Sequence, residues 1–419
     1  MSLRLRLGPA GEFLTLAASL LDYGAQAVWA IDPINGNDLG PGTLAAPLRT
    51  MAEFNTRMLG NVISVAMSLF LVGDVVDEAL TLIGVRVKAG ASLTVFGTTT
   101  TTATATISVV TVLSTGGNFS YQLTTTGITW SAADVGKRLV LPGGQVSWVG
   151  EFVDANNVIC GTFTASNGVA TTPTATQALT VQTLSQILPP DINAIASLQA
   201  TTAVTIRDVA WTTSAANGVP ANVGLFTTYF GCKCTWDGAQ SLLFVNQVNF
   251  RACFMTVTGA QALIVRGFYN EAGCTHVSAT VGQLFQGANC SIGSAFFTAY
   301  PLIVSSCGFV TGSGAHFRNT ANPLQIHQRS LWQNVNLGLS GTVGITGSGI
   351  VVKASGGLVF TSGANAKPTL SALSNGGVDV TIGTTTRTYA QIPYVDLQAN
   401  AAPNTVTTLV GTPAFMVQE

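Results

Sequence analysis

The fold is decided by an internal repeat in the middle of the chain. Residues 225–265 show it most clearly and read LFTTYFGCKCTWDGAQSLLFVNQVNFRACFMTVTGAQALIV. Short apolar triplets recur along this stretch and beyond it: Leu225-Phe226-Thr227, Leu243-Phe244-Val245, Leu263-Ile264-Val265, Leu284-Phe285-Gln286, Leu302-Ile303-Val304 and Leu324-Gln325-Ile326. Their first residues are 18, 20, 21, 18 and 22 positions apart. The repeat therefore has a period near 20 residues.

This period predicts the coils of a parallel β-helix. Each coil contributes about three short strands, and successive coils stack at the ordinary strand spacing of ~4.8 Å. Val204-Thr205-Ile206-Arg207 lies 21 residues before Leu225 and extends the series by one coil. Leucine-rich repeats have a similar period, but they need a fixed Asn ladder that this sequence lacks. We expect Leu225, Leu243, Leu263, Leu284 and Leu302 to form one inward-facing ladder.

The cysteines recur with the same period. Cys232 and Cys234 are followed in successive coils by Cys253, Cys274, Cys290 and Cys307. Small buried side chains stack well inside a narrow coil, so the sequence predicts buried, reduced thiols without disulfides. A metal site is not predicted, because Cys232-Lys233-Cys234 has no His and no second Cys pair nearby in the sequence.

The composition favours many short strands over helices. Charged residues make up 8% of the chain and hydrophobic residues 47%, and there are 45 glycines. The formal net charge is −1 and the sequence has no basic run, which argues against nucleic-acid binding. The apolar run from Val62 to Val72 is too short to span a membrane and predicts a buried strand.

A second motif precedes the repeat. Residues 29–38 read WAIDPINGND, followed by Gly42-Thr43 and by Pro47-Leu48-Arg49-Thr50. Asp and Asn favour a turn in the first part, and Thr50 can cap a helix that runs to about Met58. This order resembles the opening motif of pectate-lyase-like β-helix proteins. The resemblance implies that the helix closes the open end of the β-helix.

The coil pattern of the sequence is interrupted between residues 98 and 190. A Thr- and Ala-rich stretch is followed there by Gly127-Ile128-Thr129-Trp130 and by short strands joined at Pro142-Gly143-Gly144. This pattern predicts an inserted β module, which resembles the modules of phage tail fibres and spikes. The expected organisation is an N-terminal docking or capping segment, the β-helix start with its helix, the module, the coils and a C-terminal β segment: residues 1–27, 28–97, 98–190, 191–370 and 371–419.

The sequence offers little clustered charge for catalysis. Glycoside hydrolysis needs two facing carboxylates, and lyases pair carboxylates with a basic residue. Asp208, Asp237 and Glu271 fall at different places in their coils, so we do not expect them to meet. The denser group Asp74, Asp77 and Glu78 suits a solvated turn. The histidines are scattered, at positions 276, 316 and 327.

These observations lead to one fold and two functions. The fold is all-β, a right-handed parallel β-helix with a short N-terminal capping helix and a small inserted β module. The resemblance implies a structural or adhesive virion component, a tail spike, fibre or capsid-surface appendage that binds host glycans. The alternative is a polysaccharide depolymerase on the same fold, and a bacterial surface adhesin is a third class. We expect no catalytic residue, metal or cofactor; the binding residues stay open.

Partners and location follow from the same resemblance. We expect a homotrimer held with other virion proteins, assembled in the host cytoplasm, without nucleic-acid binding or membrane insertion. Weak surface charge and exposed strand edges favour association in such a chain.

Overall fold

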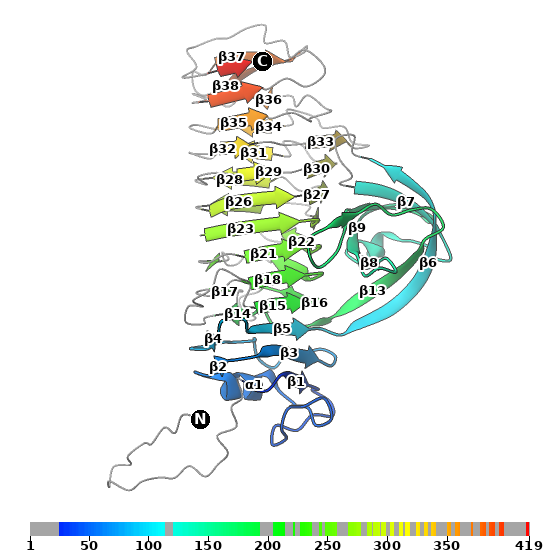
Figure 1. Ribbon diagram of the computed structural model, residues 1–419. Helices are drawn as coiled ribbons and strands as arrows, with labels where there is room; N and C mark the ends of the chain where they lie inside the picture. Colours follow the sequence, from blue (N-terminus) through cyan, green and yellow to red (C-terminus); the bar gives the residue numbers. More distant parts are fainter. Residues whose placement is uncertain are drawn as a thin grey trace.

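The computed structural model is a β-helix with a module attached to its side (Figure 1). From residue 278 onward only the backbone of strands is described, and the residues described before that point are 25–113, 120–192, 204–213, 221–222, 227–236, 243–244, 248–257 and 267–277. Among these residues, no helix is both long and apolar enough to cross a membrane.

One face of the β-helix is a 13-stranded sheet whose neighbours all pair in parallel. It begins with β1 (Val28–Ile31), β3 (Ala66–Leu71), β5 (Ser92–Phe96), β15 (Val204–Arg207), β18 (Thr227–Phe230), β21 (Val248–Arg251), β23 (Gly267–Ala272) and β26 (Ala288–Gly293). It continues with β29 (Val310–Gly312), β32 (Leu331–Gln333), β35 (Gly357–Phe360), β39 (Tyr394–Leu397) and β40 (Met416–Gln418). The stack thus continues to β40, within the expected C-terminal segment of residues 371–419.

The second face is a parallel run next to the module: β16 (Val209–Thr212), β19 (Lys233–Trp236), β22 (Phe254–Val257), β24 (Thr275–Val277), β27 (Ala295–Thr298), β30 (Ala315–Arg318) and β33 (Leu337–Ser340). The third face holds β14 (Asp191–Ile192), β17 (Ala221–Asn222) and β20 (Leu243–Phe244), then separately β25 (Gln283–Gln286), β28 (Leu302–Ser305), β31 (Leu324–Ile326), β34 (Ile350–Val352) and β36 (Leu370–Ser371). Three faces per coil confirm the predicted β-helix.

The register shows where the predicted leucine ladder is wrong. Leu302 pairs with Leu324, as the triplets predict, but Leu284 pairs with Ile303 and Gln283 with Leu302. A shift of one residue exchanges the two faces of a strand. Leu243 pairs with Ala221, while Leu225 and Leu263 lie outside the described residues. The period itself is regular on the first face, where Thr227, Val248, Tyr269 and Cys290 are successive partners 21 residues apart.

In four successive coils the chain turns from the first face to the second at a left-handed residue. Asp208, Gly231, Ala252 and Gly273 occupy this corner with φ of 63°, 61°, 49° and 66°. The first three corners bond to the next coil: the N–H groups of Asp208, Gly231 and Ala252 donate to the carbonyls of Phe230, Arg251 and Ala272. Glycine adopts this conformation without strain, which explains two of the four positions.

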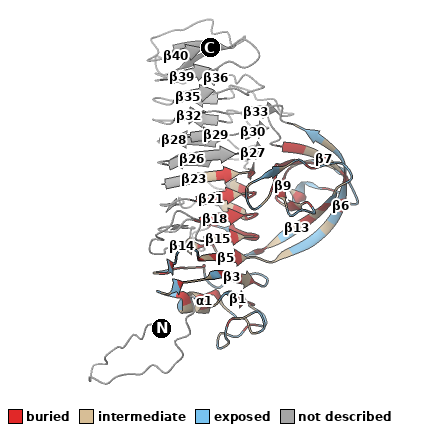
Figure 2. Ribbon diagram, viewed as in Figure 1, coloured by how far each residue is buried: buried red, intermediate tan, exposed pale blue. Residues whose placement is uncertain are grey.

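The core inside the coils is stacked in register. Ile206, Tyr229 and Phe250 are fully buried partners in consecutive coils, and the rings of Tyr229 and Phe250 stack with centroids 4.8 Å apart. Burial follows the coil strands in Figure 2, whereas the outer module strand β6 (Thr99–Val112) is largely exposed.

The predicted helix closes the first coil. α1 (Met51–Met58) buries Met51, Phe54 and Met58, and Phe54 packs edge-on against Trp29 with centroids 5.4 Å apart. Asp38 Oδ1 accepts from the N–H groups of Arg49 and Thr50, so the Asn-Gly-Asn-Asp loop holds the chain at the start of the helix.

Replacing Thr50 with alanine should cost about 1 kcal/mol of unfolding free energy, because Thr50 Oγ1 caps the helix by accepting from the Glu53 N–H at 3.2 Å. Chemical denaturation measures the loss. Thr56→Ala is the matched control, since exposed Thr56 only bonds back to the Ala52 carbonyl within the helix. Equal losses in the two variants would contradict the capping role.

The module is an antiparallel β structure inserted in the sequence between β5 and β14. It contains β6, β7 (Ser120–Thr126), β8 (Arg138–Val140), β9 (Val146–Asp154), β10 (Asn157–Gly161), β11 (Phe163–Thr164), β12 (Ala170–Thr171) and β13 (Ala178–Gln186). Its own core includes Tyr121, Trp130, Leu139, Val158 and Leu179. β13 pairs antiparallel with β6 and, at Ser185 and Gln186, parallel with β16. The return strand thereby joins the module to the coil sheet.

Candidate functional site: the cleft between module and coils

The module docks on the corner of left-handed residues. Trp148, from β9, packs with Val146 of the module against Phe230, Ala252 and Phe254 of the coils. The Trp148 Nε1–H donates to the Ala252 carbonyl at 2.6 Å. A side chain on Gly273 would have its Cβ 1.9 Å from Thr164 Oγ1, so the module approaches the coil backbone closely there. Apolar packing and backbone contact together fix the module on three coils.

A buried ion pair crosses the same junction. Arg138 Nη2 lies 2.6 Å from Asp208 Oδ1, with 6% and 13% of the two side chains exposed. Arg138 Nη1 also donates to Gln182 Oε1 at 2.9 Å, and Arg207 Nε donates to Asp208 Oδ2 at 2.9 Å. Burial lowers the pKa of Arg138, and the Asp208 carboxylate opposes this shift. Asp208 is thus a structural partner of two arginines.

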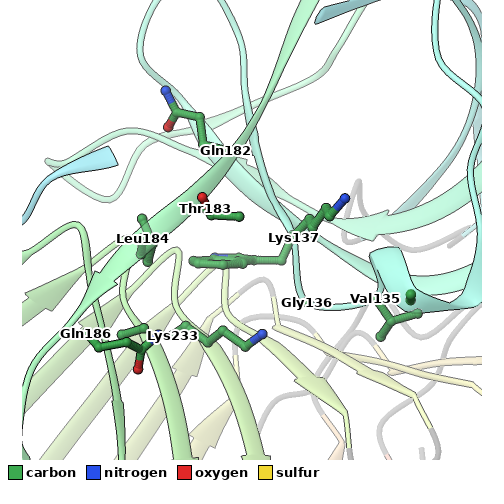
Figure 3. Close-up of a pocket in the computed structure, with 11 residues that line it drawn as sticks. Val135, Gly136, Lys137, Gln182, Thr183, Leu184, Gln186 and Lys233 are labelled. Atoms are coloured by element: carbon green, nitrogen blue, oxygen red, sulfur yellow. The ribbon is translucent and has the colours of Figure 1, made fainter. Parts of the chain in front are cut away.

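Beside this contact lies a cleft of about 230 Å³. It is lined by Ala133, Val135, Gly136, Lys137, Trp148, Gln182, Thr183, Leu184, Gln186, Ala210 and Lys233. Figure 3 shows Gln182, Thr183 and Leu184 along β13, with Lys137 on the module and Lys233 on the coil side. Trp148 is 1% exposed, so it forms part of the wall and offers little open ring surface. Apolar surface makes up more of the cleft lining than polar surface, and the polar groups come from Lys137, Gln182, Thr183, Gln186 and Lys233.

The two lysines differ in their surroundings. Lys137 Nζ lies 2.5 Å from Asp134 Oδ1. Burial raises the pKa of Asp134, but hydrogen bonds from Lys137 and Ser131 outweigh it, and the pKa lies below its usual value. Lys233 forms no ion pair with a carboxylate in the described part of the chain. Its Nζ lies 5.5 Å from the Phe254 ring centroid, and partial burial lowers its pKa.

The acidic residues considered from the sequence are not brought together. Asp208 and Glu271 belong to coils three steps apart, about 14 Å along the axis. Asp74 Oδ1 accepts a hydrogen bond from the Gln186 N–H, and Asp77 Oδ2 accepts one from the Ala52 N–H. Each carboxylate therefore binds a backbone amide group. Asp237 lies outside the described residues.

One hydrogen-bonded pair of side chains was not predicted from the sequence. His276 Nε2 is hydrogen-bonded to Glu271 Oε1, and both side chains have 0% exposure. Glu271 continues the inward column of Tyr229 and Phe250, which places the pair inside the coils, out of reach of a polysaccharide. The signal in the sequence is their spacing: five residues that span one corner. His316 and His327 lie where no side chain is described.

The described cysteines are buried free thiols: Cys160, Cys232, Cys234, Cys253 and Cys274. Burial raises the pKa of Cys160 to about 12 and raises the pKa values of Cys232, Cys234 and Cys274 well above the usual thiol range. Cys232, Cys253 and Cys274 follow the corner in successive coils, as their spacing predicts. Within the described residues, no three His, Cys, Asp or Glu side chains are arranged to hold a metal ion.

The sequence matches no known protein family and no curated protein. Among solved structures, the chain is similar to a lacto-N-biosidase from Eubacterium ramulus, with 8% identity and a TM-score of 0.32 over 80% of this chain and 59% of that one. It is also similar to the Gp54 tailspike of Acinetobacter baumannii bacteriophage AP22, solved with a capsular saccharide, with 9% identity and a TM-score of 0.21 over 74% and 61%. The chain thus spans about three fifths of each.

Proposed function

We propose that this chain is a structural and adhesive component of a virion, a tail spike, fibre or capsid-surface appendage, that binds surface glycans in the cleft between module and coils. The observation that carries the proposal is the cleft itself, a hollow with apolar and polar walls beside the packed Trp148 and the Arg138–Asp208 ion pair, on a stacked rod. Rigid positioning lowers the entropic cost of binding a flexible glycan. The opening motif at residues 29–53 resembles pectate-lyase-like proteins and supports the same assignment.

The chemistry of the lining suits a sugar. Gln182, Thr183, Gln186 and Lys233 offer amide, hydroxyl and ammonium groups that hydrogen-bond sugar hydroxyls. The volume lies below the roughly 300–1,000 Å³ of sites that enclose drug-sized ligands. A cleft of this size suits one sugar unit of a longer chain that continues over the surface.

Binding without cleavage is favoured over the depolymerase alternative. Among the cleft-lining residues that the structure describes, none is Asp or Glu, whereas hydrolysis needs two facing carboxylates. The carboxylate of Asp134 is held by Lys137 and Ser131. Glycan recognition therefore needs no catalytic group at this cleft.

The test is binding of the full chain to a panel of purified bacterial surface polysaccharides by biolayer interferometry, with new reducing ends assayed on the same samples. We expect saturable binding to at least one polysaccharide without release of reducing ends. Absence of binding across the panel would overturn the adhesive function. Steady release of reducing ends would establish the depolymerase instead.

We also propose that the chain works as a homotrimer among other virion proteins. Large apolar side chains are exposed in the first coils, including Val62, Val72, Val76 and Ile83 at 42%, 46%, 54% and 52%. Exposed apolar surface of this kind and low charge favour association. Sedimentation should give three times the chain mass of 43.1 kDa. A stable monomer at micromolar concentration would contradict this assembly.

A further inference from the structure

The charged side chains that line the cleft in the described part of the chain are all positive. Two lysines line it, and the described lining contains no carboxylate. Lys137 is neutralised by Asp134 at 2.5 Å, but Lys233 has no such partner among the described carboxylates. The cleft therefore keeps one uncompensated cation next to its hydrogen-bonding groups.

The position of Lys233 is built into the fold. Lys233 is the first residue of β19, two residues after the corner at Gly231. It lies beside Gly136 of the module, where an added Cβ would be 3.0 Å from Lys233 Nζ. Gly136 has φ of 82°, so a glycine suits this turn for conformational reasons as well. Because Gly136 has no side chain, there is room beside it for the ammonium group of Lys233.

Neighbouring groups can complete an anion site. Arg138 Nη1 donates to Gln182 Oε1 at 2.9 Å, which leaves Nε2 as the donor group of this amide. Thr183 and Gln186 are exposed on the same strand and add a hydroxyl and a second amide. A partly buried ammonium flanked by neutral donors favours a charged acceptor, because hydrogen bonds to an ionised group are stronger than neutral ones.

We propose that the cleft selects an acidic saccharide, whose sugar carboxylate pairs with Lys233 Nζ while Gln182, Thr183 and Gln186 bind the adjoining hydroxyls. This assignment deepens the proposed glycan-binding function and depends on it. It also explains the absence of carboxylates from the described lining, since a carboxylate there would repel the ligand.

The test compares oligosaccharides that contain uronic acid with the same oligosaccharides after reduction of their carboxyl groups to alcohols. Calorimetric titration uses the full-length chain and its variants Lys233→Gln, Lys233→Arg and Lys88→Gln. Lys88 is an exposed lysine outside the cleft and serves as the matched control. Unchanged unfolding curves show that each variant folds, and Lys233→Arg keeps the charge.

We expect the parent chain and Lys88→Gln to bind the acidic oligosaccharides, and Lys233→Gln to bind them about tenfold more weakly or worse, the loss that follows from removing a charge-assisted contact. Lys233→Arg should restore much of the affinity. Equal binding of acidic and reduced oligosaccharides would overturn the acidic specificity and leave the glycan function standing. An acidic preference kept by Lys233→Gln would overturn the role of Lys233, and no binding to either set would overturn both proposals.

Discussion

Replacing Trp148 with alanine is expected to lower the free energy of unfolding by about 3–5 kcal/mol, the usual cost of removing a large aromatic side chain from a core. The side chain is 1% exposed and fills the space between the module and three coil residues, Phe230, Ala252 and Phe254. The loss includes the hydrogen bond that its indole donates to the Ala252 carbonyl. Denaturant unfolding of the full-length chain measures the total.

The region that loses stability in Trp148→Ala distinguishes a role in docking the module from a general role in core packing. Hydrogen exchange should rise on both sides of the junction, in β9 and at the coil corners around Gly231 and Ala252. Trp130→Ala is the comparison. Trp130 is similarly buried, at 2% exposure, but it belongs to the core cluster of the module, which contains no coil residue. If Trp148→Ala left exchange at the coil corner unchanged, the module would not be anchored there.

Replacing Gly273 with alanine is expected to cost about 2–5 kcal/mol in two parts. A left-handed backbone costs an ordinary residue roughly 1–2 kcal/mol, and overpacking adds about 1–3 kcal/mol. The overpacking is specific: the new Cβ would lie 1.9 Å from Thr164 Oγ1 and 2.9 Å from Thr164 Cβ. Thr164 or the backbone at this contact must therefore shift to admit a single methyl group.

Gly60→Ala supplies the matched control for this effect. Gly60 has φ of 68°, close to the 66° of Gly273, but no heavy atom lies within 4 Å of its added Cβ. Gly60→Ala should lose only the backbone part, about 1–2 kcal/mol. Thermal unfolding of both full-length variants gives the difference. Equal losses would show that the module is not pressed against the corner.

The sequence predicted the parts of the fold that depend on local pattern. The coil period follows from one short strand per coil, and the stacked partners Thr227, Val248 and Tyr269 show it. The capping helix follows from Thr50, which can cap a helix that runs to about Met58. The leucine ladder failed at Leu284 because apolar alternation fixes a period but does not fix the register to one residue.

The cleft between module and coils could not be predicted from the sequence, for a different reason. Its parts are distant in the chain: Arg138 and Asp208 are 70 residues apart, and Trp148 and Ala252 are 104 apart. No local pattern marks a lysine between two cysteines as the cation of a cleft, and Lys233 gains that role only because Gly136 of the module is brought beside it. Glu271 and His276 are only five residues apart, but the corner at Gly273 between them is what brings their side chains together.

A structure of the full-length chain with a uronic-acid oligosaccharide bound, determined by crystallography or electron microscopy, would decide whether the junction is the binding site. Density for a sugar ring should appear between Lys233, Gln182 and Thr183, with its carboxylate within about 3 Å of Lys233 Nζ. Saccharide density found only elsewhere on the rod, with the cleft between module and coils empty, would contradict this assignment.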